Sequence, residues 1–208
     1  MKIIAINGSP RKGWNTDILL HKAMEGAESV GAETELIHLY DLDFKGCRSC
    51  LACKVKDGAS LGHCAVQDGL QPVLKKIAES DGLLLGSPVY FGDVTAQLRG
   101  LVERLIYPYA NFDGGKMLFQ GNLKVGSIYT MNAPAGYMDS LYKKYEEMMG
   151  WLFSYVGTVA STETLQVKDY SRYHLGMFDA QQRYERRDRV FPQDCQKAYA
   201  LGRHMAQD

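Results

Sequence analysis

The sequence lacks an excess of charge of either sign, a long apolar run and a proline-rich linker. Its 208 residues include 24 basic and 24 acidic side chains, so the composition does not indicate a nucleic-acid partner or an anionic membrane surface. The N-terminal stretch has no long apolar region of the kind that directs secretion, and we expect a cytoplasmic protein. No repeat or low-complexity tract divides the chain, which predicts a single domain over residues 1–208. These absences favour a small molecule as the ligand.

Cysteine is scarce and unevenly distributed. Only five cysteines occur, and four of them fall within eighteen residues, at Cys47, Cys50, Cys53 and Cys64. A chain of this length buries a core without disulfide bonds, and cytosolic thiols stay reduced, so fold stability does not account for the cluster. Thiolates three residues apart, followed by a fourth, are typical ligands of a [4Fe-4S] cluster.

Three interpretations of these cysteines stay open. They bind an iron-sulfur cluster, they bind zinc, or they are small buried residues. All-cysteine zinc sites usually use two separated C-x-x-C pairs, whereas here three cysteines run together. The ten residues between Cys53 and Cys64 form a long gap. The chain across this gap either folds so that Cys64 completes the site or leaves Cys64 outside it.

Strands and helices alternate along the chain. Short apolar runs predict strands, and segments with helical periodicity predict helices. The expected strands are 2–7, 33–39, 81–87, 124–130 and 163–167, and the expected helices are 17–30, 68–79, 93–106, 138–155 and 193–205. Five such units predict an α/β fold, with a doubly wound parallel sheet and helices on both of its faces.

Three segments fall outside this alternation. A cysteine-rich insertion occupies residues 41–67, and irregular stretches cover residues 107–122 and 168–191. In the last stretch, arginines are interleaved with acidic residues, which is typical of a solvated helix face or a subunit contact. These arginines are Arg183, Arg186, Arg187 and Arg189.

The loop after the first expected strand carries polar residues directly before a helix. In an open α/β sheet, ligands bind beyond the carboxyl ends of the strands, and the free N–H groups at a helix N-terminus attract anions. We therefore expect a phosphate site formed by Ser9, Arg11, Asn15 and Thr16. The motifs G-x-x-x-x-G-K-S/T and G-x-G-x-x-G are missing, so a phosphate monoester fits better. The alternative is that Asn15 or Thr16 only caps the helix and that Arg11 is solvated.

Two further loops at the same edge of the sheet suit a flat ring system. The loop after the third strand places two aromatic side chains and a glycine where a ring can stack. Its residues are Pro88, Val89, Tyr90, Phe91 and Gly92. The loop after the fourth strand is small and polar enough for its backbone to approach a ring edge. It includes Asn132, Ala133 and Gly136. The competing interpretation is that the two aromatic side chains pack in the core.

These loops resemble those of a known family. The motifs Gly-Ser-Pro-Arg at 8–11, Asn-Thr at 15–16 and Gly-Ser-Pro-Val-Tyr-Phe-Gly at 86–92 resemble the NADPH-dependent FMN reductase family. The cysteine run resembles its iron-sulfur flavoprotein branch. The resemblance implies a flavodoxin-like, five-stranded parallel sheet of order 2-1-3-4-5, bound FMN, and a homodimer or homotetramer with the flavin near a subunit interface. That branch usually has its fourth cysteine only a few residues after the third, and this sequence departs from it before Cys64.

The resemblance also implies residue roles and an activity. The loop of Ser9 and Arg11 would hold the FMN phosphate, the loops of Tyr90 and Asn132 would line the ring, and the four clustered cysteines would hold a [4Fe-4S] cluster. The implied reaction moves reducing equivalents from NAD(P)H or a reduced carrier to a quinone, a flavin or a similar acceptor. The flavin, and no protein side chain, carries that chemistry. The alternative is an iron-sulfur flavoprotein that carries electrons between ferredoxin-like partners.

Overall fold

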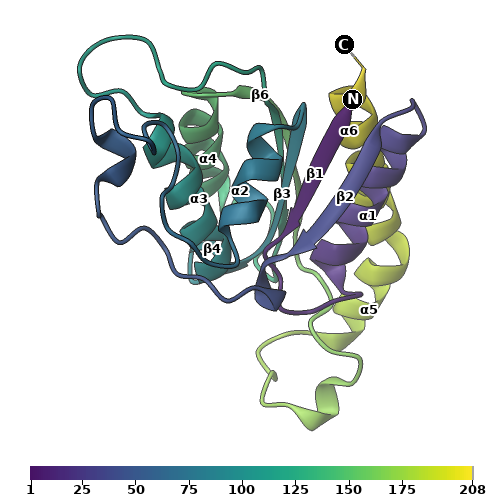
Figure 1. The fold of residues 1–208 in the computed structure, drawn as a ribbon. Helices are drawn as coiled ribbons and strands as arrows, with labels where there is room; N and C mark the ends of the chain where they lie inside the picture. Colours follow the sequence, from purple (N-terminus) through teal and green to yellow (C-terminus); the bar gives the residue numbers. More distant parts are fainter. Residues whose placement is uncertain (208) are drawn as a thin grey trace.

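A parallel sheet flanked by helices forms the centre of the computed structural model, which describes residues 1–207 (Figure 1). Its five parallel strands follow the order β2-β1-β3-β5-β6. They are β1 (Lys2–Asn7), β2 (Glu33–His38), β3 (Gly82–Tyr90), β5 (Lys124–Thr130) and β6 (Ser154–Ser161). A short strand, β4 (Asp93–Val94), pairs antiparallel with β3. Counted along the parallel strands alone, this order is 2-1-3-4-5, so the predicted flavodoxin-like fold is confirmed.

Helices cover both faces of the sheet, as predicted. Two of them pack on one face and three on the other (Figure 1). The first group is α1 (Asn15–Glu28) and α6 (Phe191–Ala206), and the second is α2 (Gln71–Ala78), α3 (Ala96–Tyr109) and α4 (Asp139–Gly150). Side chains alternate along each strand, so Ile3 of β1 packs in the core under α1 and α6, whereas Ile4 packs in the core under α2 and α3.

The sequence-based boundaries are wrong at the fifth strand. The helix expected at 138–155 ends at Gly150, and the chain then forms β6. β6 is an edge strand whose residues are mostly half-buried, so its pattern is not clearly apolar, and its β-branched residues alone mark it as a strand. Residues 163–167, the expected strand, are irregular.

A further helix, α5 (Ala180–Arg189), lies within the stretch predicted to be irregular. The Asp179 side chain begins it by accepting a hydrogen bond from the Gln182 N–H, which is a standard helix cap. Its composition is so polar that it shows little apolar periodicity. The pattern that predicts helices therefore does not detect it.

The insertion at 41–67 runs beside α3 (Figure 1) and contains a short helical turn at Ala52–Lys54. The rest of this segment has no regular secondary structure apart from residue 41, which ends an earlier turn. Within residues 1–207, no helix is both long and apolar enough to cross a membrane.

Candidate functional site

A cavity of about 350 Å³ opens at the carboxyl ends of β1, β3 and β5. Strand order reverses at this edge, which is the general ligand position in open α/β sheets. Eight of the predicted cofactor-binding residues line the cavity, namely Ser9, Arg11, Asn15, Thr16, Pro88, Val89, Tyr90 and Asn132. The remaining four belong to the same loops but are outside its walls, namely Phe91, Gly92, Ala133 and Gly136.

A buried pair of side chains fixes the loop between β1 and α1. Asn7 accepts a hydrogen bond from the Ser9 N–H at 2.8 Å and donates one from Nδ2 to Asp17 Oδ1 at 2.6 Å. The second oxygen of Asp17 accepts the Gly13 N–H at 2.7 Å. Gly13 has a φ of 72°, which costs a glycine little. The sequence analysis did not identify Asn7 or Asp17. Asn7 is a polar residue at the carboxyl end of β1, and this position could have identified it, because ligands bind at such ends in an open α/β sheet.

The N-terminus of α1 faces the cavity, and no side chain among the described residues caps it. Asn15 Nδ2 instead donates to the Leu165 carbonyl at 2.9 Å, and Thr16 Oγ1 pairs with Thr130 Oγ1 at 2.7 Å. The interpretation of Asn15 or Thr16 as a mere helix cap is therefore wrong. The first N–H groups of the helix and its dipole remain available to an anion.

Arg11 is half-buried rather than solvated. Its guanidinium lies 3.6 Å from the centre of the Trp14 ring, and Nη1 donates to the Gln166 carbonyl at 2.6 Å. Stacking on Trp14 holds the cation beside the helix N-terminus. The positive end of the α1 dipole and the Arg11 guanidinium therefore lie at the same end of the cavity.

The irregular segment 164–167 forms one wall of the cavity. Its Leu165 and Gln166 carbonyls accept the hydrogen bonds from Asn15 and Arg11. This segment follows directly from β6, so it lies at the same edge of the sheet as the three predicted loops. The sequence predicted a strand here, and the error concealed a fourth part of the site.

Two arginines of α5 reach toward the same cavity. Arg187 Nη1 donates to Asn15 Oδ1 at 2.8 Å, and Arg183 Nε donates to Asn132 Oδ1 at 2.6 Å. Arg183 is buried, and Arg187 lies 4.1 Å from the centre of the Phe191 ring. The expectation of a solvated face is therefore wrong for Arg183, which is buried. Both arginines hold the side chains that line the cavity.

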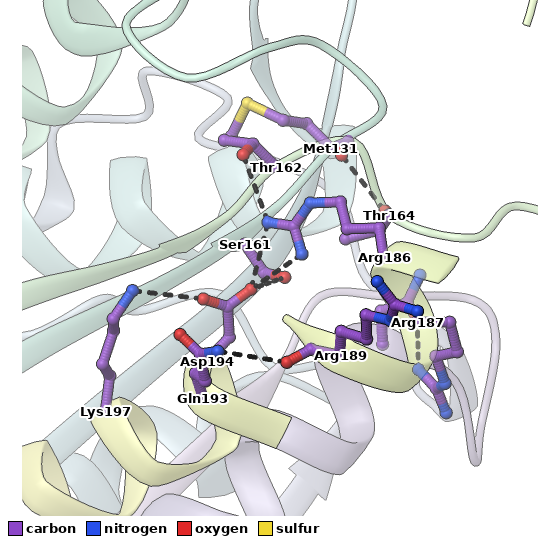
Figure 2. Close-up of polar contacts among 11 residues, drawn as sticks. Met131, Ser161, Thr162, Thr164, Arg186, Arg187, Arg189, Gln193, Asp194 and Lys197 are labelled. Atoms are coloured by element: carbon purple, nitrogen blue, oxygen red, sulfur yellow. Dashed lines mark hydrogen bonds and ion pairs between the residues drawn. The ribbon is translucent and has the colours of Figure 1, made fainter. Parts of the chain in front are cut away.

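A third arginine joins α5 to the sheet and to α6 (Figure 2). Arg186 donates to Asp194 Oδ2 at 3.2 and 3.3 Å, and Ser161 Oγ donates to the same oxygen at 2.7 Å. Lys197 Nζ contacts the other carboxylate oxygen at 3.3 Å. Asp194 is buried, and this network fixes the position of α5 behind the cavity.

Two buried amide atoms in the cavity walls have no hydrogen-bond partner among the described residues. They are Asn132 Nδ2, a donor, and Gln166 Oε1, an acceptor. Buried polar atoms are nearly always paired. A donor and an acceptor left open in one cavity are what a polar ligand with its own carbonyl, ring nitrogen or hydroxyl groups requires.

All four clustered cysteines line a second, small cavity between the insertion and α3. Its volume is about 20 Å³, so an iron-sulfur cluster needs the exposed segment with Cys47 and Cys50 to open outward. Cys53 is buried and Cys64 half-buried. The structure thus brings Cys64 to the other three despite the ten-residue gap.

N–H donors point at three of the four sulfurs. The Ser49 N–H lies 3.5 Å from Cys47 Sγ, and Arg104 Nε lies 3.3 Å from Cys64 Sγ. The Ala52 N–H lowers the pKa of the Cys50 thiol, whereas burial raises the pKa of the Cys53 thiol. Such donors stabilise the thiolate, which is the form that binds metal.

Within residues 1–207, no three Cys, His, Asp or Glu side chains converge on a point where they could hold one metal ion. In a cubane cluster each thiolate binds a different iron, so the four sulfurs surround the cluster without converging. Four thiols around one cavity are a donor set of the kind that a [4Fe-4S] cluster uses, and Cys47, Cys50, Cys53 and Cys64 are the residues that would hold it.

The strand order and the cavity at its reversal define a flavodoxin-like protein with a cofactor-sized site. The model of the NADPH-dependent FMN reductase family matches residues 1–138, which is more than half of the chain. The chain therefore belongs to this family of flavin-dependent NAD(P)H oxidoreductases.

Two similar relatives are named iron-sulfur flavoproteins. The relative from Methanocaldococcus jannaschii is 44% identical over 104 residues, which are 50% of this chain and 51% of the relative. A relative from Archaeoglobus fulgidus is 32% identical over 146 residues, or 70% of this chain and 64% of the relative. The chain spans about half the length of the first of these relatives and under two thirds of the second.

A similar solved structure covers the whole chain. The NAD(P)H:quinone oxidoreductase from Methanothermobacter marburgensis matches 100% of this chain and 98% of its own, with a TM-score of 0.72 at 15% sequence identity. At this identity the likeness establishes the shared fold.

Proposed function

We propose that the chain binds FMN in the 350 Å³ cavity and transfers reducing equivalents from NAD(P)H, or from a reduced carrier, to a quinone, a flavin or a similar acceptor. The observation that carries this proposal is the pair of unpaired amide atoms, Asn132 Nδ2 and Gln166 Oε1, in a cavity at the switch point of the sheet. Family membership supports FMN as the occupant.

The end of the cavity nearest α1 suits the FMN phosphate. The helix N-terminus, the Arg11 guanidinium and the Thr16 hydroxyl lie together there. A phosphate monoester carries a charge near minus two, and the helix dipole and the arginine both favour it. Arg187 adds a second positive charge through its contact with Asn15.

The walls formed by the loops after β3 and β5 suit the flavin ring. Pro88, Val89 and Tyr90 form one wall and Asn132 stands on another. Tyr90 is 46% exposed, so a second flat substrate can reach this side. When bound, FMN supplies the hydride and single-electron chemistry. The chain's own residues hold the ring, offer hydrogen bonds at its edge and leave one face open to the donor or acceptor.

A second candidate function is favoured by the cysteine cavity. Four thiols around one small cavity, three of them with N–H donors, suit a [4Fe-4S] cluster. A protein with FMN and such a cluster can pass single electrons between ferredoxin-like partners. The names of the relatives support this alternative.

The decisive experiment uses protein purified without oxygen and measures bound flavin by absorbance. We expect NADPH or NADH to bleach the flavin and a quinone to restore it over many cycles. Bleaching only by reduced ferredoxin, with no turnover of quinone, would favour the electron carrier. Protein that takes up no FMN would contradict both functions.

A further inference from the structure

Helix α3 holds the cysteine insertion at three points. Glu103 Oε2 accepts the Cys47 N–H at 3.2 Å at the first point. At the second point Lys54 Nζ donates to the Pro108 carbonyl at 3.0 Å and also to the Ala110 carbonyl. Arg104 is the third point. The insertion therefore takes its position from the side chains of one helix and its C-terminal end, since it has little secondary structure of its own.

Arg104 is the most completely bonded of these anchors. It is 2% exposed, and its guanidinium makes five hydrogen bonds through its five N–H groups. The partners are the Lys45 carbonyl at 3.0 Å, Asp68 at 2.6 and 3.0 Å, the Val66 carbonyl at 3.2 Å and Cys64 Sγ at 3.3 Å. Asp68 accepts in a bidentate manner and compensates the buried charge. One side chain thus ties both ends of the insertion together.

The chain between Cys53 and Cys64 folds back on itself. The Gly62 N–H donates to the Cys53 carbonyl at 3.1 Å, and the Gly58 N–H donates to the Val55 carbonyl at 3.0 Å. These turns bring residue 62 back to residue 53, so the ten-residue gap spans only a short distance. They do not by themselves direct the Cys64 thiol. Among the described residues, Arg104 is the hydrogen-bond partner of that thiol.

We propose that Arg104 is a positioning residue that directs Cys64 into the ligand set of Cys47, Cys50 and Cys53, and that its Nε–H bonds the Cys64 sulfur when a [4Fe-4S] cluster is bound. This inference rests on the proposed cluster. It explains how a sequence with a long gap before its fourth cysteine keeps four ligands. Hydrogen bonds and positive charge at a ligand sulfur stabilise the reduced cluster, which carries one more negative charge, and so raise its reduction potential.

The guanidinium suits this role better than an ammonium. It remains charged at every accessible pH, and its planar fork serves Asp68 and Cys64 at once. A lysine at position 104 would keep one positive charge but not five directed donors. We therefore expect Arg104→Lys to fold and still to place Cys64 poorly.

The test compares four variants purified without oxygen with the wild-type chain. Arg104→Gln and Arg104→Lys remove the anchor, and Cys64→Ala removes the ligand. Arg186→Gln is the matched control, because it breaks another arginine–aspartate pair, with the buried Asp194, away from the cysteines. The readouts are iron, sulfide and FMN per chain, the electron paramagnetic resonance spectrum after one-electron oxidation with ferricyanide, and the reduction potential of the cluster.

We expect both Arg104 variants to keep FMN and to resemble Cys64→Ala. A cluster that lacks its fourth thiolate loses one Fe²⁺, and ferricyanide then removes one electron from the three-iron cluster, giving the spectrum of an oxidised [3Fe-4S] centre. An Arg104 variant that keeps four irons but has a lower potential also supports the proposal, because a merely structural role would not shift the potential. Arg186→Gln should match the wild type in iron and sulfide per chain and in the reduction potential of the cluster.

Four irons with the wild-type potential in Arg104→Lys would overturn the proposal, and this variant decides the matter if Arg104→Gln does not fold. Equal loss of iron in Arg186→Gln would also overturn it, since iron loss would then reflect general destabilisation. Wild-type protein with FMN but no iron would refute the cluster itself, and protein without FMN would refute the flavin site. The failures are thus distinguishable.

Discussion

The two candidate sites are built in different ways. The proposed flavin cavity lies at the ends of paired strands, so the sheet hydrogen bonds fix the positions of its loops. The cysteine cavity lies in an insertion that is held to α3 by Glu103, Lys54 and Arg104. A site can thus take its geometry from secondary structure or from a few side chains. In the second case single substitutions should have larger effects on the site than on the fold.

The largest expected effect is loss of iron from Cys50→Ser. Serine is a poor ligand for iron, and Cys50 is the middle ligand of the close run of three, whereas Cys64 stands apart from that run. We therefore expect nearly all iron to be lost in Cys50→Ser, not the single iron lost in Cys64→Ala. FMN should stay bound, because the two sites share no residue. Iron and FMN assays on protein purified without oxygen measure this. Cys195→Ser, which changes a cysteine of α6, is the control and should keep its iron. Unchanged iron in Cys50→Ser would exclude Cys50 as an essential ligand.

The reciprocal change is the double substitution Arg11→Ala with Asn15→Ala. It removes a guanidinium and an amide from the proposed phosphate end, worth about 3 kcal/mol together, or roughly a hundredfold in Kd. We expect FMN to be lost and iron to be kept, as measured by flavin fluorescence titration. Lys12→Ala, which only breaks an exposed pair with Asp41, should bind FMN normally. Full FMN retention by the double variant would rule out the phosphate assignment.

A smaller effect is expected from Asn132→Asp. Aspartate keeps an oxygen for Arg183 but has no N–H for the ligand. A neutral hydrogen bond contributes about 1 kcal/mol, so FMN binding should weaken roughly fivefold. Titration of the flavin-free variant with FMN measures this. Affinity equal to that of the wild type would show that the Asn132 donor does not contact the cofactor.

The smallest expected effect is on the pH dependence of the free energy of unfolding, through the Asp68 carboxyl. Burial tends to raise the pKa of this carboxyl, but hydrogen bonds from Arg104 and the Leu70 N–H outweigh it and leave the pKa below its usual value. A lowered folded pKa contributes stability that is present above the unfolded pKa, about 3.9, and is lost as the pH falls through the folded pKa. Asp68→Asn removes this dependence.

Urea unfolding at several pH values measures the effect of Asp68→Asn. Both proteins should carry Cys50→Ser, so that acid loss of a cluster does not interfere. We expect the two unfolding midpoints to differ most at neutral pH and to converge below about pH 4. A difference that stays constant with pH would contradict a lowered pKa at Asp68.

The sequence predicts the sheet well because each strand is a short apolar run followed by a turn and a helix. The predicted strand at 2–7 is confirmed, and the strand order is confirmed with it. The sequence-based prediction fails at β6, an edge strand with a mixed pattern, and at α5, a helix almost without apolar residues. Patterns of apolar residues report burial, and these two elements are only partly buried.

The candidate sites were predictable to different degrees for the same reason. Residues such as Ser9 and Tyr90 follow predicted strands, so topology alone brings them to one edge. The roles of Arg183 and Arg187 were not predictable. Their contacts with Asn132 and Asn15 join residues about 50 and 170 positions apart in the sequence. Both arginines also lie on α5, a helix that the apolar pattern does not reveal. The contact between Arg104 and Cys64 was not predictable either, because it joins residues 40 apart, one of them in the irregular insertion, although Arg104 itself lies in a predicted helix.

The most direct test of two independent cofactor sites is the amount of FMN and iron per chain in wild-type protein purified without oxygen, with the absorption spectrum recorded before and after dithionite. We expect one FMN and four irons per chain, with flavin bands over a broad iron-sulfur absorption that dithionite bleaches. Iron without any flavin, even after FMN is added, would contradict the flavin cavity on which the proposed function depends.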